Sequence, residues 1–410
     1  MLLLGLIYGR PQELVEILRP LPLFYAFVAL ALLGWLTDLR LRKTRPAFAP
    51  ADGAVAAFVV WVLATVAMRR PDDLAKQTVE LLIPLVGYFL LAHAIQSFRA
   101  FQLVAATVLV LTLYLAAVAV HQGLAPRGCH VVDPRSEDAA ASYDGRRCDV
   151  VEECAGGDDP TAEYACEKAG LFGTSSVAGG RVRYRGALAD PEALALVVAL
   201  GLPFAFALFT RRPGFLRGLV VVASLCLVGG CVLYTGSRGG QVAYLAVLAT
   251  YLVRRFGWKG LVAAGLLALP VVLVARGDAE VAARASRGSY ALVAAELGFP
   301  GLVAWGSVLY LSAKIPIVAI RRYGNDSSTK LARTWALSLL AALAGLGVGL
   351  FFVPFAYHQL FWIVMGLCAA FYAACRAHDP GFEVRYGWRD LVAVVAGATA
   401  LVLYQGWQPR

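Results

Sequence analysis

Charged residues are scarce in this sequence, and their scarcity limits the class of protein. Only 16% of the 410 residues are charged and 60% are hydrophobic, whereas an average soluble domain is about 25% charged. The composition therefore excludes an ordinary soluble domain. Internal repeats and low-complexity tracts are also missing, so nothing indicates a repeat protein. What the sequence does contain is a series of long apolar runs, which indicate many transmembrane helices.

These runs predict an all-α fold: a polytopic integral membrane helical protein with about 12 transmembrane helices. The predicted spans are residues 21–38, 53–68, 76–94, 101–121, 192–210, 216–234, 241–254, 259–275, 298–320, 333–353, 358–375 and 388–405. Residues 2–8 are apolar but too few to cross a bilayer. The chain then divides into N-terminal membrane helices (1–121), a loop on the outer side that contains cysteines (122–190) and C-terminal membrane helices (191–410).

Lysines and arginines are unevenly distributed between the two sets of connecting segments. One set contains 18 of them, and the short segments of the other set contain 9; the richer set comprises residues 39–52, 95–100, 211–217, 254–259, 321–333 and 376–389. By the positive-inside rule the richer set faces the cytoplasm, which places residues 122–190 on the outer side. The net charge of +10 then reflects topology and attraction to anionic membrane lipids, and no nucleic-acid partner is expected.

Cysteines in the outer loop lack the CxxC spacing of a metal site. Four of the eight cysteines fall in this loop, at intervals of 19, 6 and 12 residues: Cys129, Cys148, Cys154 and Cys166. Because thiols in an oxidising compartment pair with one another, the loop is predicted to carry disulfides, with a metal site as the alternative. Four cysteines allow three pairings, and the sequence leaves all three open.

The stretch YTGSRGGQVAYL (234–245) places an arginine and three glycines between two predicted spans. A charge at that depth costs a few kcal/mol unless it is solvated or paired, so Arg238 is expected to face a cavity or a ligand. The glycines remove bulk and offer backbone N–H groups, which suits the close approach of an anion. The alternative is a tight turn with the arginine extended towards the lipid headgroups. Residue chemistry alone leaves both interpretations open.

Three stretches of the chain resemble one protein family. Residues 235–240 (TGSRGG), followed by a span, look like the T-x-S-R-G-G element of the O-antigen ligase and O-antigen polymerase family of polytopic membrane glycosyltransferases. Residues 183–196 (RYRGALADPEALAL) are similar to the arginine-glycine element that precedes a span in that family. Residues 287–301 (RGSYALVAAELGFPG) resemble a third family segment, through Tyr290, Glu296, Gly298 and Gly301.

The resemblance implies an enzyme of the bacterial inner membrane whose active face is periplasmic. It would transfer a glycan from an undecaprenyl pyrophosphate carrier to an acceptor hydroxyl on a lipid or saccharide, in cell-surface polysaccharide and lipopolysaccharide biosynthesis, with no metal or other cofactor. Negative charge develops on the pyrophosphate leaving group, and arginine binds phosphate oxygens in a bidentate way. The resemblance therefore assigns Arg238 to the pyrophosphate, with Arg284 and Arg287 as second choices. For these two, a solvated loop is the alternative.

A general base must take the proton of the acceptor hydroxyl. Arg287 stands where the family has a histidine, so the base is sought elsewhere. His358, in a predicted outer turn, is one candidate, and Glu296 is another. Two further histidines on the predicted outer side are His121 and His130. The alternatives are an interfacial histidine with a satisfied hydrogen bond and, for Glu296, an ion pair that holds an arginine in place.

Other residues in the family-like stretches are expected to contact the substrate. They are Ser237, Gly239, Tyr290, Arg185 and Asp190. Asp190 has an alternative role, because the sequence Asp-Pro-Glu at 190–192 suits a helix N-cap, the first helical position and the helix dipole. Arg185 alternates with two other arginines, and the three are expected to form a basic lip for an anionic substrate or for headgroups.

Ligase and polymerase share these motifs, and two functions from other classes stay open. One is a flippase or transporter for lipid-linked glycans, which would also need a basic cavity but with charges reachable from both membrane faces. The other is a catalytically inactive relative that acts as an assembly partner, suggested by the missing histidine. Lys314, in the span at 298–320, is expected only to extend its ammonium to the membrane surface.

Overall fold

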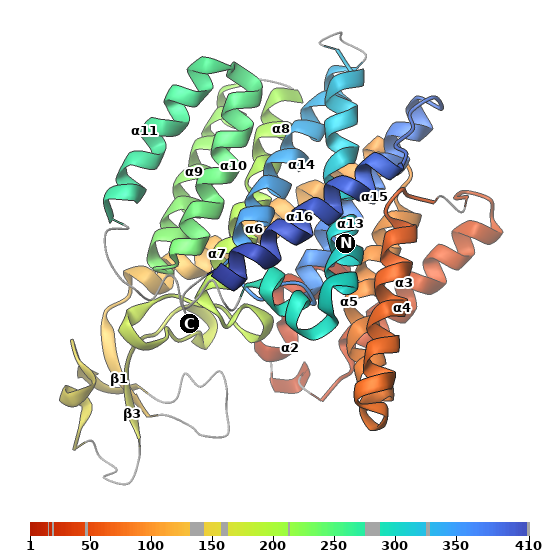
Figure 1. Ribbon diagram of the computed structural model, residues 1–410. Coiled ribbons are helices and arrows are strands. Elements are labelled where there is room, and N and C mark those ends of the chain that lie inside the picture. Colours follow the sequence, from red (N-terminus) through yellow and green to blue (C-terminus); the bar gives the residue numbers. More distant parts are fainter. Residues whose placement is uncertain are drawn as a thin grey trace.

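The computed structural model is a bundle of long helices with a small sheet at one end (Figure 1). It describes residues 1–14, 16–18, 20–45, 48–131, 143–156, 163–211, 214–274, 288–324 and 329–407. The α-helices of these residues are α1 (Leu2–Gly9), α2 (Pro11–Leu14), α3 (Leu23–Arg40), α4 (Asp52–Arg69), α5 (Leu74–Ala94), α6 (Phe98–Leu124), α7 (Pro191–Gly201), α8 (Pro203–Arg211), α9 (Phe215–Tyr234), α10 (Arg238–Phe256), α11 (Trp258–Val274), α13 (Ser289–Arg322), α14 (Lys330–Gly349), α15 (Gln359–His378) and α16 (Trp388–Trp407).

Among the residues that the structure describes, nine helical segments are long and apolar enough to cross a membrane. They are α3, α4, α5 with the turn before it, α6, α7 together with α8, α9, α13, α14 and α15. This composition indicates a membrane-embedded, polytopic and mainly helical protein, as the sequence predicted. The other three predicted spans form α10, α11 and α16, which are helical but are not among the nine. A total of twelve spans therefore stays a prediction.

Small residues let the central helices pack closely. Almost every residue of α15 is buried, and it packs along α5, where a Cβ added at Gly366 would lie 2.9 Å from the Cβ of Leu91. The pair α10 and α14 is similar, because a Cβ at Gly345 would lie 2.3 Å from a methyl carbon of Val247. Inside a membrane such close backbone contact replaces the hydrophobic effect as the source of helix association.

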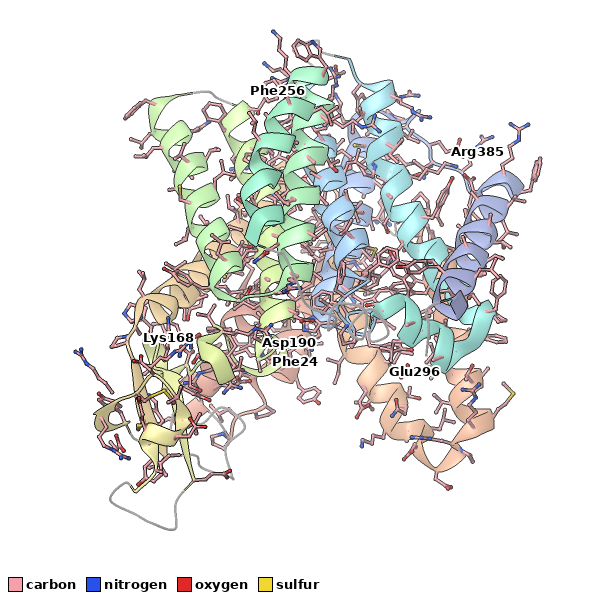
Figure 2. All side chains as sticks on the ribbon, turned by 60° about the vertical axis from the view of Figure 1, so that its left-hand side comes forward. Phe24, Lys168, Asp190, Phe256, Glu296 and Arg385 are labelled. Atoms are coloured by element: carbon pink, nitrogen blue, oxygen red, sulfur yellow. A yellow bond between two sulfur atoms is a disulfide. The ribbon has the colours of Figure 1, made fainter. Side chains whose placement is uncertain are left out.

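The two ends of the bundle carry different connections (Figure 2). Phe256 and Arg385, from connections rich in basic residues, lie at one end, and Lys168, Asp190 and Glu296 lie at the other. The second end also carries the segment between α6 and α7, residues 125–190. We call this segment the insert, and this end of the bundle the insert end.

The insert contains a three-stranded antiparallel sheet, which the sequence did not predict. The strands are β1 (Arg127–Val131), β2 (Tyr143–Arg147) and β3 (Tyr164–Lys168), in the order β2-β1-β3. The all-α prediction therefore holds for the bundle and is wrong for the insert. Its strands are only five residues long, too short to give a clear alternation of polar and apolar residues in the sequence.

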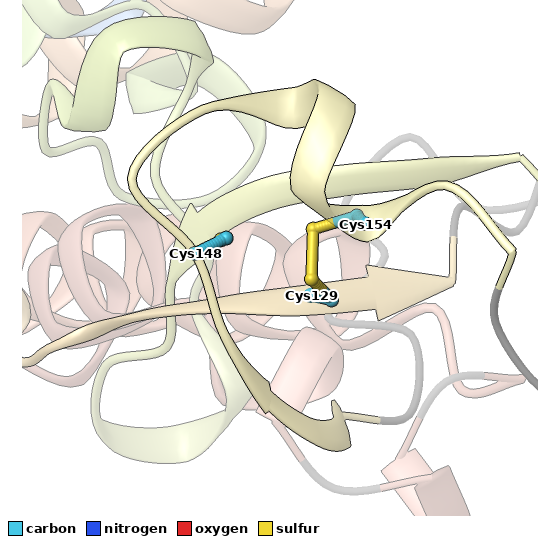
Figure 3. A group of neighbouring side chains, drawn as sticks. All are labelled: Cys129, Cys148 and Cys154. Atoms are coloured by element: carbon cyan, nitrogen blue, oxygen red, sulfur yellow. A yellow bond between two sulfur atoms is a disulfide. The ribbon is translucent and has the colours of Figure 1, made fainter.

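Two disulfides hold this sheet together. Cys129 on β1 is bonded to Cys154, and Cys148 is bonded to Cys166 on β3 (Figure 3 shows Cys148 beside the first pair). The four sulfur-bearing side chains are buried and form the small core of the insert. The sulfurs of three of them lie within 4.8 Å of one another, but all are in disulfides, so they offer no thiolate to a metal.

Lys314 makes an ion pair with the start of α16, which the sequence did not predict. Its Nζ lies 2.7 Å from both carboxylate oxygens of Asp390, in the first turn of α16, and donates to the carbonyl oxygen of Arg385 at 2.8 Å. Arg385 lies at one end of the bundle, so the ammonium extends towards that end. The hydroxyl of Tyr310 donates to the same carboxylate at 2.7 Å, and these bonds attach the start of α16 to α13.

The pairing of the insert cysteines is directly testable. Non-reducing proteolysis and mass spectrometry are expected to find peptides that link Cys129 to Cys154 and Cys148 to Cys166. Replacing Cys148 by Ser should expose one free thiol, at Cys166, and destabilise the insert by about 2–5 kcal/mol. A peptide that links Cys129 to Cys148 would contradict the pairing.

Removing one partner of the Lys314 pair should cost more stability than removing both. Asp390→Asn leaves the ammonium without its charged acceptor, and we expect a loss of about 1.5–3 kcal/mol in the free energy of unfolding in detergent. The double variant Lys314→Met with Asp390→Leu should recover most of that loss, since no unpaired charge remains. Equal stability of the Asp390→Asn variant and the wild type would show that the pair is not formed.

Candidate functional site

Residues 235–237 form the tight turn that the sequence left as one interpretation of the TGSRGG stretch. The Thr235 hydroxyl donates to the carbonyl oxygen of Val232 at 2.7 Å as α9 ends. Gly236 then has φ 59°, a left-handed conformation that favours glycine. The Ser237 hydroxyl accepts a hydrogen bond from the amide of Gly240 at 3.0 Å, so Ser237 is the N-cap of α10.

Arg238 is the first residue of α10 and is half-buried. A cation at the N-terminus of a helix opposes the helix dipole, which disfavours it by about 0.3–1 kcal/mol. An anion bound between the guanidinium and the first amides of the helix would offset this cost. The turn and the anion-binding role are thus compatible.

The glycines that follow Arg238 allow close packing. A Cβ added at Gly239 would lie 2.6 Å from the Cβ of Phe352, and one added at Gly240 would lie 2.3 Å from the Cβ of Ala195. Phe352 belongs to the segment between α14 and α15, and Ala195 to α7. Gly239, which the sequence assigned to substrate contact, thus has a packing role.

A second family-like segment packs against the same place. We call residues 349–355 the central turn. The amide of Ser289 donates to the carbonyl oxygens of Leu350 and Val353, at 2.8 and 3.1 Å, and its buried hydroxyl donates to Val353 at 2.6 Å. A Cβ on Gly288 would lie 2.1 Å from the carbonyl oxygen of Phe351. The starts of α10 and α13 therefore both contact the central turn.

Tyr290, which the sequence assigned to substrate contact, packs against the central turn and bonds to α14. Its hydroxyl donates to the carbonyl oxygen of Gly347 at 3.0 Å, and its ring lies 4.6 Å from that of Phe351 and 5.5 Å from that of Trp305. These contacts account for the tyrosine by packing alone.

The third family-like stretch, 183–196, also reaches the insert end. Asp190 accepts a hydrogen bond from the amide of Glu192 at 3.1 Å and is the N-cap of α7, which is the alternative that the sequence gave for it. The arginines of the expected basic lip donate mainly to backbone carbonyl oxygens. Arg181 donates to Thr235 at 2.9 Å, and Arg185, which is 9% exposed, donates to Glu13 at 2.6 Å and to Phe172. These bonds connect the insert to the bundle.

His358 is the N-cap of α15, and this use limits its chemistry. Its Nδ1 accepts a hydrogen bond from the amide of Leu360 at 3.2 Å, and its ring stacks on that of Phe355 at 4.1 Å. A neutral histidine whose Nδ1 accepts a hydrogen bond carries its proton on Nε2. In this arrangement the lone pair of Nδ1 is occupied and Nε2 already carries a proton, so His358 is a weaker candidate for the general base. His130 is buried in the sheet of the insert, beside the ring of Tyr143 at 5.4 Å.

Glu296 lies at a break in α13. Gly298 has φ 68°, and Pro300 lacks the N–H that would bond to the carbonyl oxygen of Glu296. Arg69 of α4 supplies the missing donor, with Nη1 at 2.8 Å from that oxygen. The expected ion pair of Glu296 with Arg238 is not among the contacts of the described residues; its carboxylate lies beside the Tyr357 hydroxyl. Burial, and then that carboxylate, raise the pKa of Tyr357 above its ordinary value.

A cavity of about 430 Å³ opens beside Glu296. It is lined by Val62, Thr65, Val66, Arg69, Arg70, Gln77, Glu80, Leu81, Glu296, Leu297 and Tyr357. Of the sequence-predicted site residues that the structure describes, only Glu296 lines it. The signals that could have indicated it are the paired arginines at 69–70 and a carboxylate, Glu80, inside a predicted span. Arg284 and Arg287 lie outside the described residues.

The fold and these contacts define a membrane-embedded helical protein with a disulfide-linked insert and two polar regions at the insert end. One contains Arg238 and the central turn, and the other is the cavity beside Glu296. In Figure 2, Glu296 lies well apart from Asp190, the cap of the helix that packs against the start of α10. Comparisons with protein families, with curated proteins and with solved structures found no match to this chain.

The close approach to the central turn can be tested with single methyl groups. Gly288→Ala should destabilise the protein by about 1–3 kcal/mol, because the added Cβ meets a backbone oxygen at 2.1 Å. Gly34→Ala on α3 is the matched control: nothing lies within 4 Å of its Cβ, so it should be neutral or slightly stabilising. The measurement is thermal unfolding in detergent. Equal midpoints for the two variants would contradict the packing described.

Proposed function

We propose that the protein transfers a glycan from a polyprenyl pyrophosphate carrier to an acceptor hydroxyl at the insert end. The observation that carries the proposal is the convergence of separate stretches of sequence. The starts of α10 and α13 contact the central turn, and α7 packs against the start of α10. These three places contain the segments that resemble the O-antigen ligase and polymerase family. The glycines of these segments allow the close packing, and Arg238 stands among them at the start of α10.

The chemistry of the transfer assigns Arg238 its role. The acceptor oxygen attacks the anomeric carbon of the glycan, and the bond from that carbon to the pyrophosphate oxygen breaks. The bonding electrons go to the pyrophosphate, so negative charge increases there in the transition state. Arg238 stabilises this charge with a bidentate guanidinium at the start of a helix, which also favours anions.

The acceptor proton goes to a base. Of the two groups that the sequence suggested, His358 has its Nδ1 occupied by the amide of Leu360. Glu296 has a carboxylate that lines a cavity. We assign Arg238 to the leaving group. Glu296 stays a sequence-based candidate for the base, because it lies in the second polar region and a base must be within hydrogen-bond reach of the acceptor hydroxyl.

A flippase is the less favoured alternative. It would need polar groups along a path between the two ends of the bundle. Arg238 starts α10 and Phe256 ends it at the opposite end, and Glu296 also lies at the insert end. The candidate residues thus gather at one face, as a transferase that acts on that face requires.

Complementation of surface polysaccharide in a strain that lacks this protein tests the proposal. At matched expression, Arg238→Ala should lower polysaccharide at least about 100-fold, because one preorganised donor to developing charge is lost. Arg238→Lys should fail as well, since a point charge does not replace a bidentate fork. Arg255→Ala, at the opposite end of the same helix, is the control and should complement fully. Full polysaccharide from Arg238→Ala would contradict the assignment of Arg238 to the leaving group.

The inactive-relative alternative needs a test with purified protein, because an assembly partner would also complement the strain. An active protein should turn over the lipid-linked donor when an acceptor is offered. Retained binding of the donor lipid with no turnover, whatever acceptor is offered, would favour the inactive relative and contradict the proposal of transfer.

A further inference from the structure

The cavity beside Glu296 is bounded by α4, by α5 and by the break in α13. We call it the α4–α5 cavity, because most of its lining comes from those helices. At the break in α13, Pro300 has no N–H to donate to the carbonyl oxygen of Glu296. Arg69 donates to that oxygen at 2.8 Å, and the indole N–H of Trp61 donates to the carbonyl oxygen of Leu297 at 2.9 Å. Both donors are on α4, so the broken helix is fixed against it.

The lining separates into an apolar floor and a polar rim. Val62, Val66, Leu81 and Leu297 give apolar surface, and Val62, Leu81 and Leu297 are buried. The rim contains two arginines, two glutamates, a glutamine and a tyrosine. A floor that accepts C–H groups and a rim that offers polar atoms is typical of small-ligand sites, whose volumes are about 300–1,000 Å³.

The balance of charge on the rim decides the kind of ligand. Arg69 and Arg70 contribute two positive charges, and Glu80 and Glu296 contribute two negative charges, so the lining is neutral in total. A pyrophosphate would meet two carboxylates there, and that repulsion opposes it. A neutral ligand with many hydroxyl groups meets no such repulsion. It can donate to the carboxylates and accept from the guanidinium and amide groups.

The rim retains capacity for a ligand. Within the described part of the chain, no hydrogen bond or ion pair engages the Arg70 side chain. Glu80 has only the solvated Lys76 ammonium nearby, at 4.0 Å, with both side chains more than half exposed. Arg70, directly after α4, and Glu80 of α5 therefore present a donor and an acceptor that a sugar ring with neighbouring hydroxyls could bridge.

We propose that the α4–α5 cavity binds a saccharide, and that this saccharide is the acceptor end of the glycan transfer. The binding of a saccharide does not depend on the proposed function. The acceptor role of that saccharide rests on the proposed function. Arg70 and Glu80 recognise hydroxyl groups, the apolar floor contacts the C–H face of the ring, and Glu296 faces the acceptor hydroxyl from the break in α13.

Saturation-transfer NMR on the full chain in nanodiscs tests the binding. The probe is the mixture of oligosaccharides released by mild acid from the envelope glycolipids of the organism that makes the protein. Wild type should transfer saturation to at least one component. Arg70→Ala and Glu80→Gln should weaken its binding about tenfold or more, with unchanged thermal unfolding. Asp72→Asn, exposed and outside the lining, is the control and should bind as wild type.

Three outcomes would overturn the inference. The first is no saturation transfer to any component, and the second is transfer that is the same in the Arg70 and Glu80 variants as in wild type. The third is displacement of the saccharide by millimolar inorganic pyrophosphate. The last would make the cavity an anion site.

Kinetics separates this inference from the proposed function. In a transfer assay, Arg70→Ala should raise KM for the acceptor about tenfold and leave KM for the lipid-linked donor unchanged, whereas Arg238→Ala should lower kcat. If wild type binds the saccharide through Arg70 but transfers no glycan, the proposed function fails and the saccharide site stands. If transfer occurs and Arg70→Ala changes neither binding nor KM, the site fails and the function stands.

Discussion

The close approach of the central turn to the starts of α10 and α13 is the constraint on which the insert end depends. Gly239 and Gly288 have no room for a Cβ against Phe352 and the carbonyl oxygen of Phe351. Ser289 adds hydrogen bonds to two carbonyl oxygens of the turn, which would otherwise be unsatisfied at the end of α14. Any side chain at these positions would separate the segments, and with them the start of α10 that carries Arg238.

The break in α13 follows from the same arrangement and creates the second polar region. The helix begins against the central turn and must then turn into the bundle, and it does so at Gly298 and Pro300. At the break, Arg69 and Trp61 of α4 donate to the carbonyl oxygens of Glu296 and Leu297, and the cavity lies between α4, α5 and α13. The central turn and the cavity are thus joined by one short segment of α13, from Ser289 to Gly298.

The sequence predicted what depends on local or compositional rules. Long apolar runs located the helices because a bilayer demands about 20 such residues, and Asp-Pro-Glu at 190–192 indicated the cap of α7 because capping is local. It did not predict the sheet of the insert, whose strands are short, or the choice among three disulfide pairings. It also missed Arg69 and Arg70. Their site depends on a contact between residues 227 positions apart, which no local pattern encodes.

The most direct test of the central claim uses purified protein in nanodiscs with an undecaprenyl-pyrophosphate-linked glycan from the producing organism. The measurement is the release of free undecaprenyl pyrophosphate, with and without the organism's acceptor glycolipid. The account predicts release that requires the acceptor and equals the amount of glycan transferred to it. No release with any acceptor, or movement of intact donor across the bilayer without release, would contradict it.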